Sequence, residues 1–90
     1  MSDVVDNAAR GRFELVEEGL TAFADYRREA GRLVIPYVES PPPLRGKGTA
    51  GRLMEGVLAA ARAEGLKVTP ICGYAVAYIR RHREHHDLLD

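Results

Sequence analysis

The residues that most constrain this chain are the eleven from 41 to 51, PPPLRGKGTAG, near the middle of its 90 residues. Three consecutive prolines have a restricted φ and no N–H group, so we expect them to end the segment that precedes them. Glycines then alternate with basic residues, and glycine adopts backbone conformations that other residues avoid. The hydrophobic pattern changes its period across this stretch, which therefore separates two parts of different secondary structure.

Before the stretch, apolar residues follow the two-residue period of β-strands. The pattern predicts strands over 12–16, 20–27 and 32–39, joined by short turns at 17–19 and 29–31, as in an antiparallel meander. Pro36 lies inside the third of these strands and cannot donate a hydrogen bond to a neighbour. We therefore expect either a sheet edge or a β-bulge at Pro36.

After the stretch, helical spacing runs from about residue 49 to 64, and Gly65 is a typical stop signal. A short strand over 67–71 and a second helix over about 74–82 follow. The order βββαβα predicts an α/β (α+β) fold, in which helices pack on a mostly antiparallel sheet. We expect one domain over 1–90, with 1–10 and 84–90 as frayed tails.

Composition limits the class of protein. A hydrophobic content of 46% fits a globular domain, and a net charge of zero argues against general binding to nucleic acid. The single cysteine excludes an internal disulfide. Neither a signal peptide nor an apolar run of about 18 residues is present, so we expect no membrane span and a cytoplasmic protein.

A strand that leads into a glycine-rich turn and then a helix is suited to binding phosphate. The first turn of a helix has unpaired N–H groups and a partial positive charge. Arg45, Lys47 and Arg52 are expected to add positive charge nearby. The spacing matches neither a P-loop nor a Rossmann fingerprint. The pattern alone leaves open a flexible loop that caps a helix.

Two motifs together resemble the GNAT acyl-CoA transferases. LRGKGTAG, residues 44–51, is similar to the family's pyrophosphate loop, [QR]-x-x-G-x-[GA], with Pro43 in place of the opening Gln or Arg. GLKVTPICGYAVAYIRRH, residues 65–82, resembles a short, single-domain branch of the family. The resemblance covers about 12–89 and implies a trimmed GNAT core.

The resemblance also implies an activity, which is transfer of an acetyl group from acetyl-CoA to an amine acceptor, either a small molecule or a protein. It implies that CoA contacts a set of residues in the loop and the second helix. These are Leu44, Arg45, Gly46, Lys47, Gly48, Thr49, Ala50, Gly51, Tyr78 and Arg81. For Arg81, favourable charge at a helix C-terminus is an alternative explanation. We expect a monomer or a weak homodimer.

Catalytic roles are implied less directly. Many family members protonate the CoA thiolate with a tyrosine of the second helix, a position that falls on Ile79 here. We therefore predict that Cys72, just before that helix, is either a nucleophile that accepts the acetyl group or a proton donor to CoA. Glu39 is the predicted general base. Tyr37 stands where relatives in the short branch often have histidine. An inert buried cysteine and a solvated carboxylate remain the alternatives.

Two other functions stay open from the sequence. One is a non-catalytic module that binds acetyl-CoA or CoA, and the other is a protein-interaction domain. His82, His85 and His86 have the spacing of metal ligands on a helix, but no cysteine or suitable carboxylate completes a site. We therefore expect no metal.

Overall fold

A computed structural model describes residues 3–89 of the chain. Within these residues the secondary structure consists of strands, two α-helices and short 3₁₀ turns (η). In chain order they are β1 (Val5–Asn7), η1 (Ala8–Arg10), β2 (Arg12–Glu17), β3 (Leu20–Glu29), β4 (Arg32–Glu39), η2 (Pro42–Leu44), α1 (Thr49–Ala63), β5 (Lys67–Pro70), α2 (Gly73–Arg81) and η3 (Arg83–Leu88).

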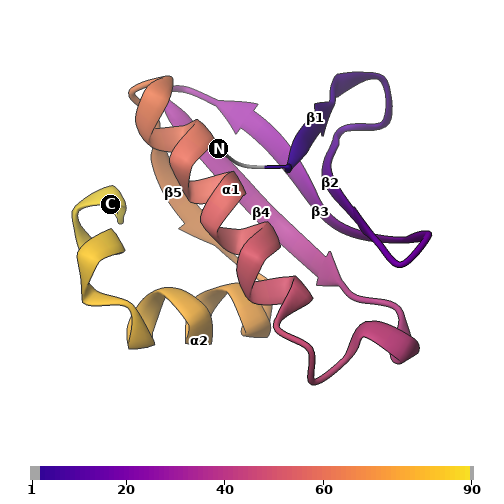
Figure 1. Cartoon of the computed structure of the whole chain (residues 1–90). Coiled ribbons are helices and arrows are strands. Elements are labelled where there is room, and N and C mark those ends of the chain that lie inside the picture. The colour runs from indigo at the N-terminus through magenta and orange to yellow at the C-terminus, as the bar shows by residue number, and fades with distance from the viewer. Residues whose placement is uncertain (1–2, 90) are drawn as a thin grey trace.

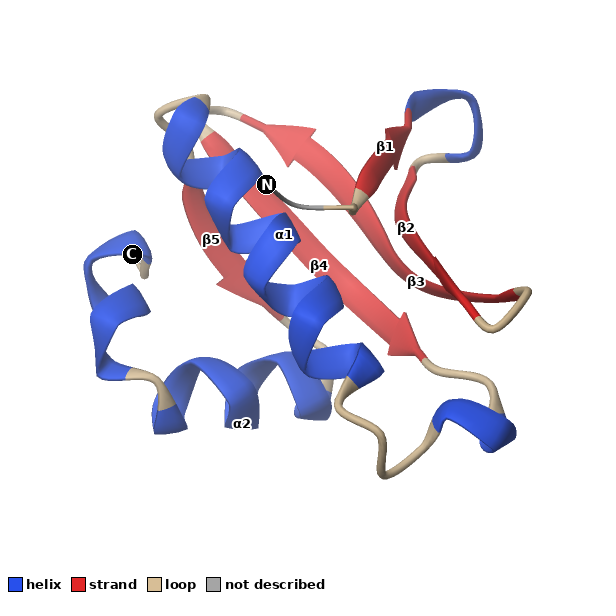
Figure 2. Cartoon of the chain, viewed as in Figure 1, coloured by secondary structure: helices blue, strands red, loops and turns tan. Residues whose placement is uncertain are grey.

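The strands form one sheet in the order β1-β2-β3-β4-β5. The first four are antiparallel to their neighbours, and β5 joins β4 in parallel through the α1 crossover. α1 runs diagonally across one face of the sheet (Figure 1). α2 lies near the N-terminal end of α1. Figure 2 shows the resulting layers of helix and strand. The expected mixed fold, with helices on a mostly antiparallel sheet, is confirmed.

Both predicted hairpin turns are present, and each has two residues. In the first turn, Glu17 pairs with Leu20 around Glu18 and Gly19. In the second turn, Glu29 pairs with Arg32 around Ala30 and Gly31. All four turn residues have positive φ, which is the type I′ arrangement that suits the twist of paired strands. Glu18 and Ala30 occupy positions that asparagine or glycine usually takes.

β4 changes its partners at Pro36. Its register with β3 shifts so that Ile35 and Pro36 together face the single residue Tyr26, which is a β-bulge. On the other side, β5 pairs with β4 only as far as Ile35, whose carbonyl accepts from the N–H groups of Ile71 (3.0 Å) and Cys72 (3.2 Å). Pro36 therefore lies at a bulge toward β3 and at the start of an open edge toward β5.

The core lies between the sheet and the two helices. α1 buries one face that includes Leu53, Val57 and Ala61, and α2 adds Ala75 and Ile79. The sheet contributes Phe13, Leu15, Ala22, Ala24, Leu33, Ile35 and Val68. Within the described residues, no helix has both the length and the apolar character needed to cross a membrane.

The terminal segments differ from the frayed tails that we expected. Residues 5–7 form β1, and Asp6 accepts hydrogen bonds from Tyr26 Oη (2.6 Å) and Arg28 Nη2 (2.9 Å) of β3. At the other end, Leu88 is buried and Leu89 forms a parallel bridge with Val68. These segments are ordered because cross-strand partners and the core hold them. Residues 1, 2 and 90 of the expected tails lie outside the described residues.

Candidate active site

A pocket of about 420 Å³ lies between the end of β4, the loop that follows it and the first turn of α1. Tyr74 of α2 closes one side. The lining residues are Tyr37, Val38, Glu39, Ser40, Leu44, Arg45, Gly46, Gly48, Thr49, Ala50, Gly51 and Tyr74. The fold thus brings seven of the ten residues predicted to bind the cofactor to one pocket, together with the predicted base Glu39.

A second pocket of about 390 Å³ lies along the other side of α1. Its lining includes the carboxylates of Asp3, Glu17 and Glu55 against the single guanidinium of Arg52. This balance of charge is unfavourable for an anionic ligand such as a CoA pyrophosphate. The first pocket is therefore the better candidate for an anion.

The loop places the start of α1 beside the first pocket. Residues 42–44 form η2, and Gly46 and Gly48 then have φ of 80° and 82°, which glycine adopts without a steric penalty. Gly48 is the N-cap, and no side chain caps the helix. The first turn also lacks acidic residues. Its N–H groups are thus available to an anion in the pocket.

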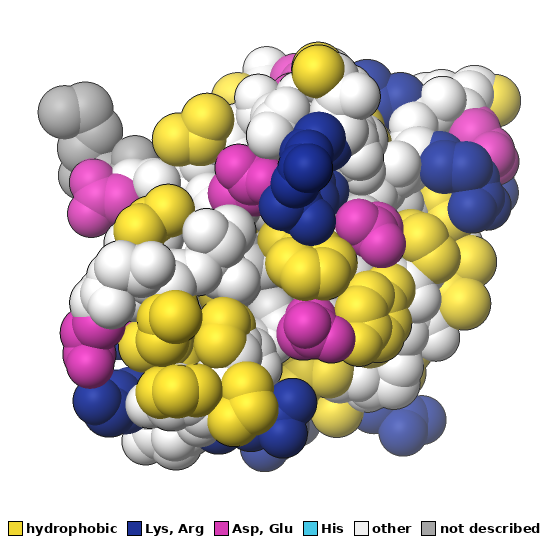
Figure 3. Space-filling view, turned by 90° about the vertical axis from the view of Figure 1, so that its right-hand side faces the viewer, with side chains coloured by type: hydrophobic (Ala, Val, Ile, Leu, Met, Phe, Trp, Pro, Cys, Tyr) yellow, Lys and Arg dark blue, Asp and Glu magenta, His cyan; other side chains and the backbone are white. Residues whose placement is uncertain are grey.

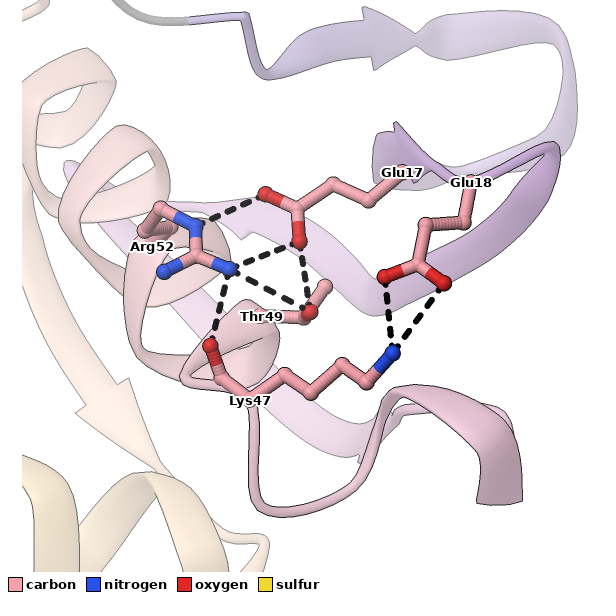
Figure 4. Close-up of polar contacts among 5 residues, drawn as sticks. All are labelled: Glu17, Glu18, Lys47, Thr49 and Arg52. Carbon is pink, nitrogen blue, oxygen red and sulfur yellow. Dashed lines mark hydrogen bonds and ion pairs between the residues drawn. The ribbon is translucent and has the colours of Figure 1, made fainter.

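The basic side chains of the loop do not all serve the pocket. Lys47 Nζ pairs with Glu18 Oε2 (2.9 Å), and Arg52 Nε pairs with Glu17 Oε2 (2.7 Å) (Figure 4). The sequence predicts that Lys47 and Arg52 add positive charge at a phosphate site, but in the structure their side chains pair with Glu18 and Glu17 instead. The carboxylates of Glu17, at the end of β2, and Glu18, in the following turn, pair with these cations, and neither Lys47 nor Arg52 lines the pocket.

Glu17 connects the hairpin to the start of α1. Its carboxylate accepts from Thr49 Oγ1 (2.6 Å) and from Arg52 Nε and Nη2 (both 2.7 Å). Arg52 Nη2 also donates to the carbonyl of Lys47 (3.0 Å), between the two glycines of the loop. The hydrogen bonds from Arg52 and then Thr49 lower the pKa of Glu17 to about 2. No local sequence pattern marks Glu17, because its partners lie far along the chain.

Cys72, Tyr37 and Glu39 gather where β4 separates from β5. Cys72 is the N-cap of α2 and packs, partly buried, against the core. Tyr37 Oη donates a hydrogen bond to Glu39 Oε1, which is the largest reason that the pKa of Tyr37 is raised. The charge of nearby Cys72 makes a smaller contribution in the same direction. Tyr37 and Glu39 both line the pocket, whereas Cys72 is not among the lining residues.

Tyr78 and Arg81, also predicted to contact CoA, are outside the pocket lining. Tyr78 is buried, and a Cβ on Gly51 would lie 3.5 Å from its ring. Its hydroxyl donates to Glu55 Oε2, and burial, followed by this hydrogen bond, raises the pKa of Tyr78. Arg81 is exposed on the last turn of α2.

The three histidines contact different groups. His82 Nδ1 donates to the carbonyl of Tyr78 (2.7 Å), while His86 Nε2 donates to that of Ile79 (3.0 Å). His85 Nε2 contacts Glu55 Oε2 (2.9 Å). Among the described residues, no group of three or more His, Cys, Asp or Glu side chains is arranged to hold a metal ion.

The sequence was also compared with known proteins. A family model described as GCN5-related N-acetyl-transferase matches residues 12–88, which include the pocket, Cys72 and both sequence motifs. A search of curated proteins found no match to the chain.

Proposed function

The chain belongs to the GCN5-related N-acetyltransferase (GNAT) family, and from this premise we propose that it transfers an acetyl group from acetyl-CoA to an amine acceptor. The observation that carries the proposal is the pocket at the uncapped N-terminus of α1, lined by Gly46 and Gly48. The N–H groups of Thr49, Ala50 and Gly51 would bind the CoA pyrophosphate.

The residues present fit CoA at both ends of the pocket. The loop offers N–H groups and the guanidinium of Arg45, whose Nε donates to the carbonyl of Ser40 (3.1 Å). The open edge of β4 beyond Ile35 offers backbone groups that suit the amides of a pantetheine arm. Acetyl-CoA would supply the thioester, and the protein would orient it near Cys72 and Glu39.

Glu39 is the candidate general base for the acceptor amine. An amine attacks a thioester carbonyl only when it is unprotonated, so a carboxylate at the end of β4 would accept its proton. The hydrogen bond from Tyr37 would hold the Glu39 carboxylate in place at the end of β4.

Cys72 has two possible roles, which require different chemistry. As a nucleophile, its thiolate would form a bond to the acetyl carbon while the bond from that carbon to the CoA sulfur breaks. The acceptor amine would then displace the Cys72 sulfur. As an acid, it would instead give its proton to the departing CoA thiolate while the amine attacks directly.

A second candidate is a CoA-binding module without catalysis. Ile79 replaces the usual tyrosine acid, Pro43 replaces the polar residue that opens the loop motif, and Glu39 is already engaged by Tyr37. This alternative predicts binding of acetyl-CoA with no transfer to any amine.

Calorimetric titration with acetyl-CoA tests the binding step. Gly46→Ala and Gly65→Ala form a matched pair, because both glycines have positive φ and open space around a new Cβ. Each substitution should destabilise the fold by about 1–2 kcal/mol. Only Gly46→Ala should weaken acetyl-CoA binding, since only Gly46 lines the pocket. If the wild-type protein does not bind acetyl-CoA, both candidate functions are wrong.

Mass spectrometry separates the candidates that remain. The protein is incubated with acetyl-CoA, with and without a panel of primary amines. An acetyl group on Cys72 that disappears when an amine is added supports the nucleophile. Turnover without an adduct, reduced in Cys72→Ala, supports the acid. Binding without acetylated product from any amine supports the non-catalytic module.

A further inference from the structure

Ser40 has an unusual position at the edge of the pocket. It follows the last residue of β4 and is one of the lining residues. Its Oγ is shielded from solvent and has no hydrogen-bond partner among the described residues. Buried hydroxyl groups in folded proteins nearly always have a partner. The missing partner therefore requires an explanation that the fold alone does not provide.

Arg45 provides a second hydrogen-bond donor beside Ser40 in the lining of the pocket. Its Nε donates to the carbonyl of Ser40 (3.1 Å), which holds the guanidinium beside the end of β4. Lys47 and Arg52 face carboxylates of the β2–β3 turn instead. Of these three basic residues, Arg45 is the one that lines the pocket and has no ion pair among the described residues.

We propose that the Ser40 hydroxyl binds a phosphoryl oxygen of the ligand in this pocket, together with the guanidinium of Arg45. Ser40 is partly exposed at the edge of the pocket, so rotation about its Cα–Cβ bond can move the shielded Oγ to another staggered position toward the ligand. A hydroxyl and a guanidinium both donate to phosphate, and the contact with a charged group is stronger than one between neutral groups. The inference rests on the proposed function, because CoA is the ligand that would present the phosphoryl group.

This assignment gives the loop a donor set at each end. The N–H groups of 49–51 lie at the start of α1, while Ser40 and Arg45 lie at the end of β4. Pro43, where the family motif has Gln or Arg, has no side-chain donor. Ser40 and Arg45 would therefore supply the side-chain donors that Pro43 cannot provide at this end.

The test compares ligand affinity with stability in Ser40→Ala. Removing a hydroxyl that has no partner should leave the thermal midpoint of the free protein unchanged or raise it. The same change should weaken CoA binding about tenfold, as expected for loss of a hydrogen bond to a charged group. Binding of pantetheine, which has no phosphate, should not change. Ser40→Thr keeps the hydroxyl and should retain most of the affinity for CoA.

Arg45→Ala and the double variant Ser40→Ala/Arg45→Ala complete a thermodynamic cycle. If both side chains bind the same phosphoryl group, their effects on CoA affinity should not add, because either loss disturbs one shared contact. Additive effects on CoA affinity would contradict the shared contact. A lower thermal midpoint for Ser40→Ala with unchanged CoA affinity would show a purely structural hydroxyl and overturn the proposal.

Inorganic pyrophosphate, titrated in parallel, separates this inference from the proposed function. If the wild-type protein binds pyrophosphate but not CoA, and Ser40→Ala loses the pyrophosphate, the phosphoryl site stands and the acetyl-CoA function fails. If the wild-type protein binds CoA and Ser40→Ala binds it equally well, the function stands and this inference fails. Binding of neither ligand overturns both.

Discussion

Glu17 holds the start of α1 through its charge, so the fold should depend on pH through this residue. Its pKa falls from an ordinary 4.5 to about 2 in the folded protein, because Arg52 and Thr49 donate to it. The unfolded chain therefore binds more protons between these values, and the contribution of Glu17 is full above about pH 4.5 and is lost as the pH falls toward 2. Glu17→Gln should have a lower thermal midpoint than wild type at pH 7.

Thermal unfolding of both proteins from pH 7 to pH 2 checks this. The gap between their midpoints should close as the pH falls through that window. Other carboxylates with a lowered pKa, such as Glu64 and Asp87, affect both proteins alike and cancel in the difference. A gap that stays constant with pH would show that Glu17 acts through packing and not through its charge.

Tyr78 offers a second test at the scale of single residues, because two roles for it predict opposite results. Its hydroxyl donates to Glu55 and its ring packs on Gly51. The structural role predicts that Tyr78→Phe loses about 1 kcal/mol of unfolding free energy, the usual value for one hydrogen bond. It also predicts unchanged CoA affinity. Calorimetry and urea unfolding measure both, and a clear loss of CoA affinity would support the role implied by the family resemblance.

At the scale of secondary-structure elements, one substitution in the turn of the β3–β4 hairpin should stabilise the fold. Ala30 has a φ of 43° in the first position of its two-residue turn, a conformation that is unfavourable for alanine. Ala30→Asn would create the Asn-Gly pair that type I′ turns prefer, and should stabilise the fold by about 1 kcal/mol. Urea unfolding measures the gain, and CoA affinity serves as the control because the turn is outside the pocket. Equal or lower stability would contradict the turn assignment.

The elements themselves were largely predictable because their signals are local. The alternation of apolar residues gave β2, β3 and β4, and the observed ends differ from the expected ones by two residues or fewer. β1 has no such signal. Its three residues are held by pairing with β2 and by Tyr26 and Arg28 of β3, which a local pattern cannot reveal.

In the candidate site too, local sequence patterns do not reveal contacts between residues that are distant in the chain. The glycine loop and the start of α1 follow from short-range chemistry, so the sequence predicts where they lie in the chain. The pairing of Lys47 with Glu18 and of Arg52 with Glu17 depends on the β2–β3 turn reaching the loop in three dimensions. Ser40 had no recognisable signal either, because only the folded structure shows that its hydroxyl lacks a partner.

At the scale of the whole molecule, positive and negative charges balance. The chain has 13 basic and 13 acidic residues. Figure 3 shows acidic and basic side chains interspersed among apolar ones on the face that it presents. No broad field of one sign covers that face, so an anionic ligand must be attracted by groups close to it. Under the proposed function, the N–H groups at the start of α1 and the guanidinium of Arg45 would provide that attraction.

The two edges of the sheet give a prediction for the oligomeric state. Exposed edge strands promote association when they are long and unobstructed. Here β1 has three residues and β5 has four, and Leu89 bridges to Val68 on β5. These two edge strands therefore offer few backbone groups to a second copy, and we expect a monomer in sedimentation velocity experiments over a wide range of concentration.

If that experiment shows a dimer, two kinds of interface are to be distinguished, one formed by strand pairing and one formed by side chains. Strand pairing would protect the amides of 5–7 or 67–70 from hydrogen exchange in a concentration-dependent way. An interface on side chains would instead bury the exposed Tyr37 and Ile71, near the site where β4 separates from β5. Ile71→Ser should dissociate that second kind of dimer and leave the exchange of both edge strands unchanged. Concentration-dependent protection of an edge strand would contradict the argument from strand length.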